Sequence, residues 1–514
     1  MNNENLFAAL KVAFPSDWDS VAIEADWTYS WRDMDHATAQ MANLLDSLQL
    51  PAGARVAAQV DKSVEALVLY LATLRAGYVF LPLNTAYQKT EIEYFIGNAT
   101  PAVVVCTPQN FGWVSPIAFK AGTQSVFTLG ADRTGSLLER AAHCSTEHTV
   151  AVRGADDLAA ILYTSGTTGR SKGAMLSHGN LLSNALVLKE YWGWKPDDVL
   201  LHVLPIFHVH GLFVAVHGAM LAGCKMIWCA QFNPQRVLEK LPQATVFMGV
   251  PTLYVRLLAE AGLNAEVTRN MRLFISGSAP LLIATFNEWT ARTGHTILER
   301  YGMSETIMLT SNPYQGERRG GTVGFPLPRV DVRVQKDDAD GGTACAVGEI
   351  GGIQVRGPNV FSGYWQMPEK TKEEFTADGF FKTGDVGMVD ADGYVHIVGR
   401  SKDLIISGGY NVYPAEIEGV INALVGVAES AVVGVPDADF GEVGVALVIA
   451  QAGAVLEPTA ILQTLKSTLA NFKVPKRCHI VTELPRNAMG KVQKNVLRTQ
   501  FATQPPIHNE PMKQ

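Results

Sequence analysis

The chain contains few cysteines for its length. Six occur in 514 residues, and no two of them form a Cys-x-x-Cys pair. Such a sparse set excludes a scaffold held together by disulfides, on which many small secreted domains depend. We therefore expect free thiols and a protein of a reducing compartment.

The chain also has fewer basic than acidic residues. The chain has 42 Lys and Arg residues against 49 Asp and Glu, which gives a formal net charge of -7. This balance argues against a broad surface for nucleic acid or for an anionic membrane. Apolar residues at 47% and charged residues at 18% exclude a disordered chain, and 46 glycines without a three-residue period exclude collagen.

A long uninterrupted apolar run is missing as well. The most apolar stretch, residues 64–83, contains Glu65 and Arg75 and breaks at Gly77. This pattern favours a buried helix followed by a strand over a membrane span. The first residues, MNNENLFAALKVAFPSDW, have no cationic segment before an apolar one and are poor in arginine, unlike a signal peptide or a mitochondrial presequence. We expect a cytoplasmic protein.

Helical and strand-like patterns alternate over residues 1–150 and again over 156–300. Such βα alternation predicts parallel sheets covered by helices, and therefore an α/β fold. The expected strands include residues 54–60, 78–83, 102–106, 159–163, 246–250 and 273–276, and the expected helices include one over 64–75.

The composition and residue pattern of the sequence change twice in the second half. Residues 320–400 are rich in glycine and in short alternating runs, which predicts a small β meander or barrel. Residues after Arg400 predict a compact mobile α+β unit. We expect a large N-terminal domain with two helix-covered sheets and a small β-barrel-like subdomain over 1–399, a hinge at 400–403, a small C-terminal domain over 404–503, and a flexible tail over 504–514.

A loop rich in glycine and hydroxyl side chains, Thr164-Ser-Gly-Thr-Thr-Gly-Arg-Ser-Lys-Gly173, follows the apolar strand at 158–163. Glycines let backbone N–H groups turn toward an anion, hydroxyls add donors, and Lys172 adds a charge suited to phosphate. The loop is not a Walker A motif, because two residues separate Gly169 from Lys172. On composition alone, a flexible turn remains an alternative.

The loop and a series of further motifs are similar to the adenylate-forming superfamily, which contains acyl-CoA synthetases, peptide-synthetase adenylation domains and luciferases. The resemblance spans roughly residues 20–500, and the likeness is strongest to malonyl-CoA synthetases. The motifs that carry it, in order, are Tyr163–Gly173, Leu204–Gly211, Ser276–Leu281, Arg300–Glu305, Tyr364-Trp365, Lys382–Asp385, Gly399–Asp403, Gly408–Glu418 and Pro485–Lys491.

The resemblance implies a two-step ligase reaction. A carboxylate attacks the α-phosphate of ATP and gives an acyl-adenylate and pyrophosphate, and the thiol of coenzyme A then displaces AMP. ATP, Mg²⁺ and coenzyme A are the implied cofactors, and a small dicarboxylic acid is the implied partner. No covalent nucleophile is required, so the protein must hold ATP, neutralise charge and aim the acid.

The same resemblance assigns residues to the nucleotide. Glu305 is expected to hold Mg²⁺, Tyr301 to stack on adenine, and Asp385 to bind the ribose. Arg400 is expected at the ribose or phosphate, and Lys491 at the α-phosphate and the acyl carboxylate. The remaining expected nucleotide contacts are Thr164, Ser165, Gly166, Thr167, Thr168, Gly169, Lys172, Ser278, Ala279, Glu299, Gly302 and Thr306, with Thr168 also counted among the catalytic groups.

The position of Lys491 in the small domain implies that the domains close for adenylation. The resemblance then implies a rotation about Lys402 that brings Gly408 and Gly409 to the pantetheine channel. Each of these residues alone has a plainer interpretation. Asp385 could be a turn residue, Glu305 a solvated helix charge, and Lys491 a surface lysine.

Arg300 stands where the superfamily usually has glycine or another small residue, next to the acid pocket. A guanidinium can donate two hydrogen bonds to a second carboxylate, which favours a short diacid such as malonate, with methylmalonate partly tolerated. His208 matches a gating position, and His210 and Ser278 could add donors. A salt bridge from Arg300 to Glu299 and a core role for His210 remain alternatives.

Other function classes remain open at this stage. A fatty-acyl- or aryl-CoA ligase shares every nucleotide residue and differs in the acid pocket, so Arg300 is the discriminating feature. The further alternatives are a carrier-protein-loading adenylation enzyme, a luciferase-like oxygenase and a nucleotide sensor without catalysis. The sequence predicts neither the oligomeric state nor acetylation of Lys491.

Overall fold

The structure is a computed structural model that describes residues 3–164, 171–336, 342–408, 410–437, 439–487 and 490–502. Its contacts divide the chain into two compact units. The first unit comprises Met1–Leu281, Thr285–Val332 and Val355–Phe381, and the second comprises Leu282–Ala284, Arg333–Gln354 and Lys382–Gln514. Within the described ranges, no helix has both the length and the apolar character that crossing a bilayer requires.

The first unit contains a seven-stranded sheet in the order β18-β8-β7-β4-β3-β5-β6. Its central strands pair in parallel, and β7, β8 and β18 pair antiparallel at one edge. The strands are β3 (Arg55–Gln59), β4 (Val79–Pro82), β5 (Val103–Cys106), β6 (Ser125–Thr128), β7 (Leu158–Thr164), β8 (Lys172–Ser177) and β18 (Gly363–Tyr364).

A nine-stranded sheet completes the first unit, in the order β15-β14-β13-β12-β11-β9-β10-β1-β2. The strands from β1 to β13 pair in parallel along this order, and the edges are antiparallel. The strands are β1 (Val21–Glu24), β2 (Thr28–Ser30), β9 (Val199–His202), β10 (Lys225–Trp228), β11 (Val246–Gly249), β12 (Leu273–Ser276), β13 (Leu298–Tyr301), β14 (Thr310–Ser311) and β15 (Phe325–Pro326).

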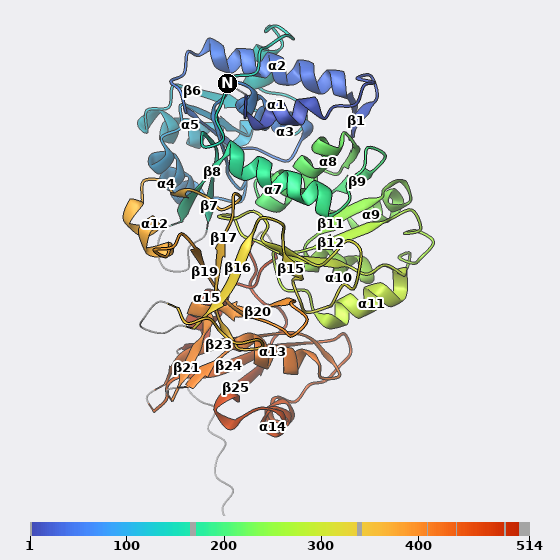
Figure 1. The fold of residues 1–514 in the computed structure, drawn as a ribbon, viewed down its shortest axis with the longest axis vertical. Helices are drawn as coiled ribbons and strands as arrows, with labels where there is room; N and C mark the ends of the chain where they lie inside the picture. Colours follow the sequence, from blue (N-terminus) through green and yellow to red (C-terminus); the bar gives the residue numbers. More distant parts are fainter. Residues whose placement is uncertain are drawn as a thin grey trace, which may run out of the picture. The chain divides into compact units, whose positions relative to one another are not determined.

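Helices cover these two sheets, and Figure 1 shows α9, α10 and α11 beside β11 and β12. The helix α3 is buried along its whole length, because its apolar residues surround the axis on every side. The helices are α1 (Leu6–Val12), α2 (Trp31–Ser47), α3 (Val64–Arg75), α4 (Lys89–Ala99), α5 (Phe111–Lys120), α6 (Ser136–Ala141), α7 (His178–Tyr191), α8 (His217–Ala222), α9 (Pro234–Lys240), α10 (Pro251–Leu258), α11 (Ile283–Thr293) and α12 (Pro368–Glu374).

Most of the second unit is built on two further sheets. One has four strands in the order β16-β17-β19-β20, and the other has the order β22-β21-β24-β23 with β25 paired to β24. The elements are β16 (Asp331–Gln335), β17 (Gly351–Arg356), β19 (Phe381–Val389), β20 (Val395–Arg400), β21 (Ile405–Ser407), β22 (Tyr410–Val412), α13 (Pro414–Asn422), β23 (Val427–Asp437), β24 (Gly441–Ala450), α14 (Pro458–Thr468), β25 (Arg477–Ile480) and α15 (Lys494–Ala502).

The larger sheet of the second unit has a core on both of its faces. Alternate residues of β23 point to opposite sides, so Val432 packs with α13 and α14 while Val433 packs with Leu497 and Phe501 of α15. The helix α15 therefore lies on the face opposite α13 and α14. This arrangement places the loop that carries Lys491 directly before α15.

The predicted fold class is confirmed, with two helix-covered sheets, a small β unit and a C-terminal α+β unit. The segment predicted as a small β meander or barrel forms a four-stranded sheet in the order β16-β17-β19-β20. The predicted hinge segment, 400–403, begins at the last residue of β20 and ends before β21, inside the second unit as contacts define it. The predicted domain limits, including the tail from 504, which lies outside the described residues, stay predictions.

Candidate active site

The carboxyl ends of three parallel strands, β11, β12 and β13, meet at one edge of the nine-stranded sheet. Ligands of α/β proteins bind at such edges, because the loops that leave the strands converge there. The segment 276–278 leaves β12 and the segment 300–302 leaves β13 at this edge. The fold therefore brings together two motifs that are more than twenty residues apart in the sequence.

Arg300 is a buried cation within the first unit. Its side chain lies against Gly277, where an added Cβ would stand 2.5 Å from the guanidinium carbon. The residue is 3% exposed, and among the described residues neither Nε nor Nη2 has a hydrogen-bond partner. Desolvation lowers the pKa of Arg300 to about 9, so the guanidinium is still charged at pH 7. A buried, unpaired cation of this kind is a ready partner for an anionic ligand.

Two histidines stand near this guanidinium, one on the loop that follows β9 and one at the start of the next helix. His208 accepts a hydrogen bond at Nδ1 from the backbone N–H of His210, at 3.3 Å. Desolvation, followed by the positive charge of Arg300, lowers the pKa of His208 to about 4. His208 is therefore neutral at pH 7 and carries its proton on Nε2, where it can donate.

His210 is fully buried at the first turn of a π-helix, His210–Val216. Its Nδ1 lies 3.5 Å from the Ser278 hydroxyl, and its Nε2 has no partner among the described residues. Ser278 itself has a φ of 71°, a strained backbone conformation that is found most often at functional sites. π-Helical turns also concentrate at such sites. The structure thus joins His210 and Ser278 to the surroundings of Arg300.

Glu305 is buried, and the Tyr364 hydroxyl donates a hydrogen bond to its Oε1 at 3.0 Å. The ring of this tyrosine also interacts with a cation, because the Lys172 ammonium lies over it at 4.1 Å from the ring centroid. Lys172 makes an ion pair with Glu374 at the end of α12, with 3.3 Å between Nζ and Oε1. Tyr364 therefore connects the predicted phosphate-binding lysine to the predicted Mg²⁺ ligand.

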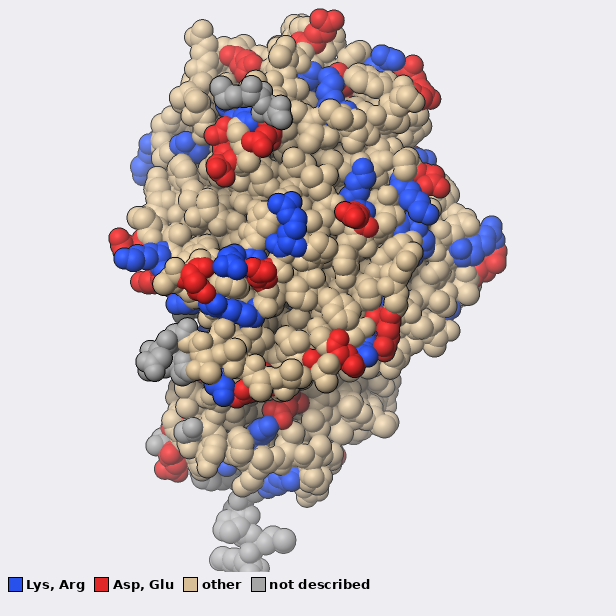
Figure 2. Space-filling view, in the orientation of Figure 1, with Lys and Arg blue, Asp and Glu red and all other residues tan. Residues whose placement is uncertain are grey.

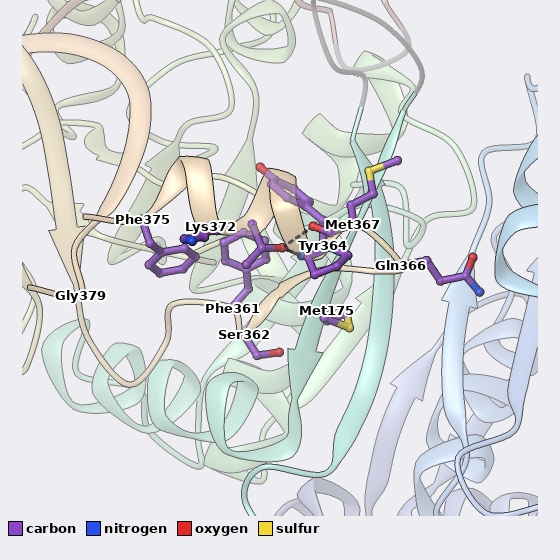
Figure 3. A pocket seen from close by; sticks show the side chains of 11 residues that line it. Met175, Phe361, Ser362, Tyr364, Gln366, Met367, Lys372, Phe375 and Gly379 are labelled. Atoms are coloured by element: carbon purple, nitrogen blue, oxygen red, sulfur yellow. Dashed lines mark hydrogen bonds between the residues drawn. The ribbon is translucent and has the colours of Figure 1, made fainter. Parts of the chain in front are cut away.

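Aromatic packing fixes Tyr364 in place. The Phe361 ring packs edge to face against the Tyr364 ring, with 4.9 Å between the ring centroids. Both rings line a pocket of about 780 Å³, and Phe375 and Met175 are also among its lining residues (Figure 3). Tyr364 also donates its backbone N–H to the Thr371 hydroxyl at 2.9 Å. Its orientation is thus set from the backbone and from the ring.

The loop between β13 and β14 brings Thr306 into the interior. An added Cβ at Gly302 would stand 1.9 Å from the Ile307 carbonyl oxygen, so only glycine permits this close approach. Thr306 is fully buried, and its hydroxyl has no partner among the described residues. A free buried hydroxyl beside Glu305 fits a phosphate oxygen. Tyr301, at the end of β13, is half-buried.

Thr164 and Lys172 face each other at the base of the predicted phosphate loop. They are paired residues of the antiparallel strands β7 and β8, and the Thr164 hydroxyl donates to the Lys172 carbonyl at 3.3 Å. The other predicted loop residues, together with Gly409, lie outside the described residues. These are Ser165, Gly166, Thr167, Thr168 and Gly169.

Glu299 points away from Arg300, because adjacent residues of a strand face opposite sides. Its Oε1 accepts the backbone N–H of Leu281 at 3.1 Å, so the salt bridge that was an alternative for Arg300 is not formed between these described residues. Leu281 belongs to the loop that also contains Ala279. Burial raises the pKa of Glu299 to about 8, and the carboxyl is therefore protonated at pH 7.

Replacing Glu299 by glutamine is expected to change the pH dependence of stability. The unfolded carboxyl ionises near 4.5 and the folded one near 8, so the native state binds more protons between these values. As the pH rises through this window, the group lowers the free energy of unfolding by up to ~1.4 kcal/mol per unit. Thermal unfolding at pH 5.5 and 8.5 checks this: the Tm of Glu299→Gln relative to wild type should rise with pH, and an equal difference at both pH values contradicts it.

The second unit holds its own group of predicted site residues. Asp385 on β19 and Arg400 on β20 are register partners and form an ion pair at 2.7 Å. Partial burial, followed by the charge of Arg400, lowers the pKa of Lys402 to about 8, and Lys491 contributes to the same shift. Lys491 is exposed, and its backbone N–H donates to the Asn487 side chain at 3.0 Å. Gly408 is exposed in the turn after β21.

Several supporting residues are absent from the sequence-based prediction. Glu374 is 202 residues from its partner Lys172, and Gly277 matters only because Arg300 lies on it. Tyr254 donates to the Ile275 carbonyl at 2.6 Å and lies near the Arg300 guanidinium. Of these supporting contacts, the sequence indicated only Tyr364, through the motif Tyr364-Trp365, and the motif did not indicate which residues Tyr364 contacts.

The arrangement fits a nucleotide with a divalent ion. Among the described residues, no three His, Cys, Asp or Glu side chains converge as a metal site. An ion at Glu305 would take its other ligands from phosphate and water, as Mg²⁺ commonly does. On the face of the molecule shown in Figure 2, acidic and basic side chains are interspersed.

Comparison with known proteins also indicates a nucleotide-binding enzyme. The chain matches the AMP-binding enzyme family over residues 12–365 and the AMP-binding enzyme C-terminal domain over 416–491. It is 35% identical to a malonate–CoA ligase of Arabidopsis thaliana, over 97% of this chain and 90% of the relative, and 37% identical to a mitochondrial malonate–CoA ligase of Bos taurus, over 87% and 81%.

A crystal structure of ATP-bound MatB from Rhodopseudomonas palustris superposes with a TM-score of 0.95 at 55% identity, covering 98% of this chain and 99% of that one. The chain belongs to the AMP-binding enzyme family. The adenylate-forming superfamily predicted from the motifs is thereby confirmed, and so is the enzyme class, an AMP-forming ligase. The structural neighbour has ATP bound and the relatives are named as CoA ligases, in agreement with the predicted use of ATP and coenzyme A.

Proposed function

We propose that the chain is a malonyl-CoA synthetase, which joins malonate to coenzyme A through an acyl-adenylate and releases AMP and pyrophosphate. The observation that carries this proposal is the buried guanidinium of Arg300, whose Nε and Nη2 have no partner among the described residues. A monocarboxylic acid would leave this cation unpaired. The second carboxylate of malonate supplies the missing partner. The malonate–CoA ligases among its relatives support the same substrate.

Neutral donors around Arg300 support a short diacid. The Nε2–H of His208 and the Ser278 hydroxyl can each donate to a carboxylate oxygen, and neither brings a second positive charge. Methylmalonate adds one methyl group and no charge, so we expect partial use of it. A long apolar acid has no charge to offer Arg300, and this makes a fatty acid a poor substrate.

The remaining residues support the nucleotide chemistry. Lys172, with the loop before it, would bind the β- and γ-phosphates, and the Thr306 hydroxyl would bind an oxygen of the α-phosphate. Mg²⁺ held by Glu305 would supply positive charge beside the transferring phosphorus. Lys491 neutralises charge where the carboxylate attacks, so the protein acts by positioning and electrostatics.

A screen of pyrophosphate release tests this function. The acids are acetate, malonate, methylmalonate, succinate and octanoate, each with and without coenzyme A. We expect malonate to give the highest kcat/KM and to yield a thioester only when coenzyme A is present. Faster turnover of acetate or octanoate would contradict the assignment and favour an ordinary acyl-CoA ligase.

Lys402→Pro is expected to impair thioester formation more than adenylation. The change fixes φ and removes an N–H at Lys402. This residue lies in the segment that we propose as the hinge about which the small domain rotates between the two half-reactions. Pyrophosphate exchange measures adenylation, and the reaction of supplied malonyl-adenylate with coenzyme A measures the second step. Equal losses in both assays would count against a hinge at this position.

We propose a cytoplasmic location, and the six free cysteines support a reducing compartment. Because relatives include mitochondrial enzymes, the test is a C-terminal fluorescent fusion expressed in its own cells. Signal confined to an organelle or envelope would contradict the proposal.

A further inference from the structure

The segment Ser401–Asp403 is a short 3-10 turn between the two sheets of the second unit. Both of its ends are held. On one side, Arg400 is the last residue of β20 and is fixed by its backbone pairing and its ion pair with Asp385. On the other side, Ile405 begins β21 and is fully buried in the core under α13.

One side chain reaches this turn from far along the chain. Arg498, in the middle of α15, donates from Nη2 to the Lys402 carbonyl at 3.2 Å and to Oδ1 of Asp403 at 2.9 Å. Both side chains of the ion pair are partly buried, with 32% of Arg498 and 20% of Asp403 exposed. Charge-assisted hydrogen bonds in such a setting are stronger than neutral ones.

The helix that supplies Arg498 is itself firmly attached. Leu497 and Phe501 of α15 pack into the core on the face of the sheet opposite α13. Lys494 in its first turn pairs with Glu418 at 2.6 Å. The helix also follows the Lys491 loop directly, so one rigid element connects that loop to the turn at 401–403.

We propose that Arg498 is a positioning residue that fixes the C-terminal side of the hinge to the small domain. Because the Lys402 carbonyl and Asp403 move with α15, rotation is confined to the backbone between Arg400 and that carbonyl. A short pivot lets the small domain turn as one body and carry the Lys491 loop with it. This inference rests on the proposed two-step function.

Two readouts test the proposal on the full-length enzyme. Hydrogen–deuterium exchange of the amides of 401–404 reports the anchor without any catalysis. In Arg498→Ala we expect this exchange to accelerate about tenfold, because the turn loses both tertiary hydrogen bonds. Thioester formation from supplied malonyl-adenylate should fall about tenfold, while pyrophosphate exchange changes less than about twofold. Arg498→Lys, which keeps the positive charge, should recover part of the amide protection at 401–404 and part of the rate of thioester formation.

The matched control is Arg477→Ala. Arg477 on β25 donates to the Phe501 carbonyl at 3.2 Å, so this variant loosens the end of α15 and keeps the Arg498 side chain that bonds to the hinge. It should leave exchange at 401–404 and both half-reactions near wild-type values. The same changes in Arg477→Ala as in Arg498→Ala would reduce Arg498 to a structural role and overturn the proposal.

Two further outcomes also overturn it. Unchanged exchange at 401–404 in Arg498→Ala would show that the side chain does not hold the turn. Faster exchange with equal losses in both half-reactions would show that the anchor does not serve the rotation. If the wild-type enzyme failed to use malonate, the proposed function would fall, and the exchange comparison would still decide whether Arg498 holds the turn.

Discussion

Arg300→Gly is expected to lower kcat/KM for malonate by about 30-fold to several thousand-fold. Losing one member of a buried charge pair typically costs about 2–5 kcal/mol, and each 1.4 kcal/mol is about tenfold. Nε and Nη2 of the guanidinium have no hydrogen-bond partner among the described residues, so both can donate to the substrate. Steady-state kinetics with malonate, acetate and ATP measure the effect.

The pattern across substrates separates recognition from damage to the fold. The KM for ATP should stay near its wild-type value, and acetate should lose little, because acetate has no second carboxylate. Arg300→Met is the companion variant, since it fills the same volume without a charge. Its Tm should equal or exceed that of wild type, because the buried unpaired cation is destabilising. Unchanged malonate turnover in both variants would remove the assignment of Arg300.

Lys491→Ala is expected to lower the adenylation rate by about 10²- to 10³-fold. Removing a single group that stabilises charge in a transition state has effects of this size. The reaction of supplied malonyl-adenylate with coenzyme A should be nearly spared, because the acid is already activated at that stage. Pyrophosphate exchange and the isolated thioester assay give the two values.

The matched control for this prediction is Lys494→Ala, three residues further along. Lys494 makes an ion pair with Glu418, and we assign it no role at the nucleotide. It should change adenylation by no more than a few-fold. A comparable loss in both variants would indicate that general positive charge near this loop, rather than Lys491 itself, supports the reaction.

Local patterns predicted many elements closely. The buried helix at Val64–Arg75 and the strand at Leu273–Ser276 have the bounds that were expected. Apolar periodicity and flanking residues determine such segments over a few neighbours, so a short window of sequence contains the necessary information. The motifs likewise identified the family, because their order along the chain is specific.

Tertiary contacts were not predictable in this way. Glu374 is 202 residues from Lys172, and Arg498 is 95 residues from Asp403. Neither side chain belongs to a recognisable pattern, and each acquires a role only when the strands and helices pack. The space beside Gly277 that accepts Arg300 is of the same kind.

The amino-acid order alone determined the α/β class and the adenylate-forming family, and it predicted an arginine beside the acid pocket. The packed structure decided that Nε and Nη2 of this arginine are buried without a hydrogen-bond partner among the described residues, that Glu299 faces away from it, and that His208 is neutral. The reason is physical: propensity and motif chemistry act between near neighbours, whereas desolvation and charge depend on every group that folding brings within a few ångströms.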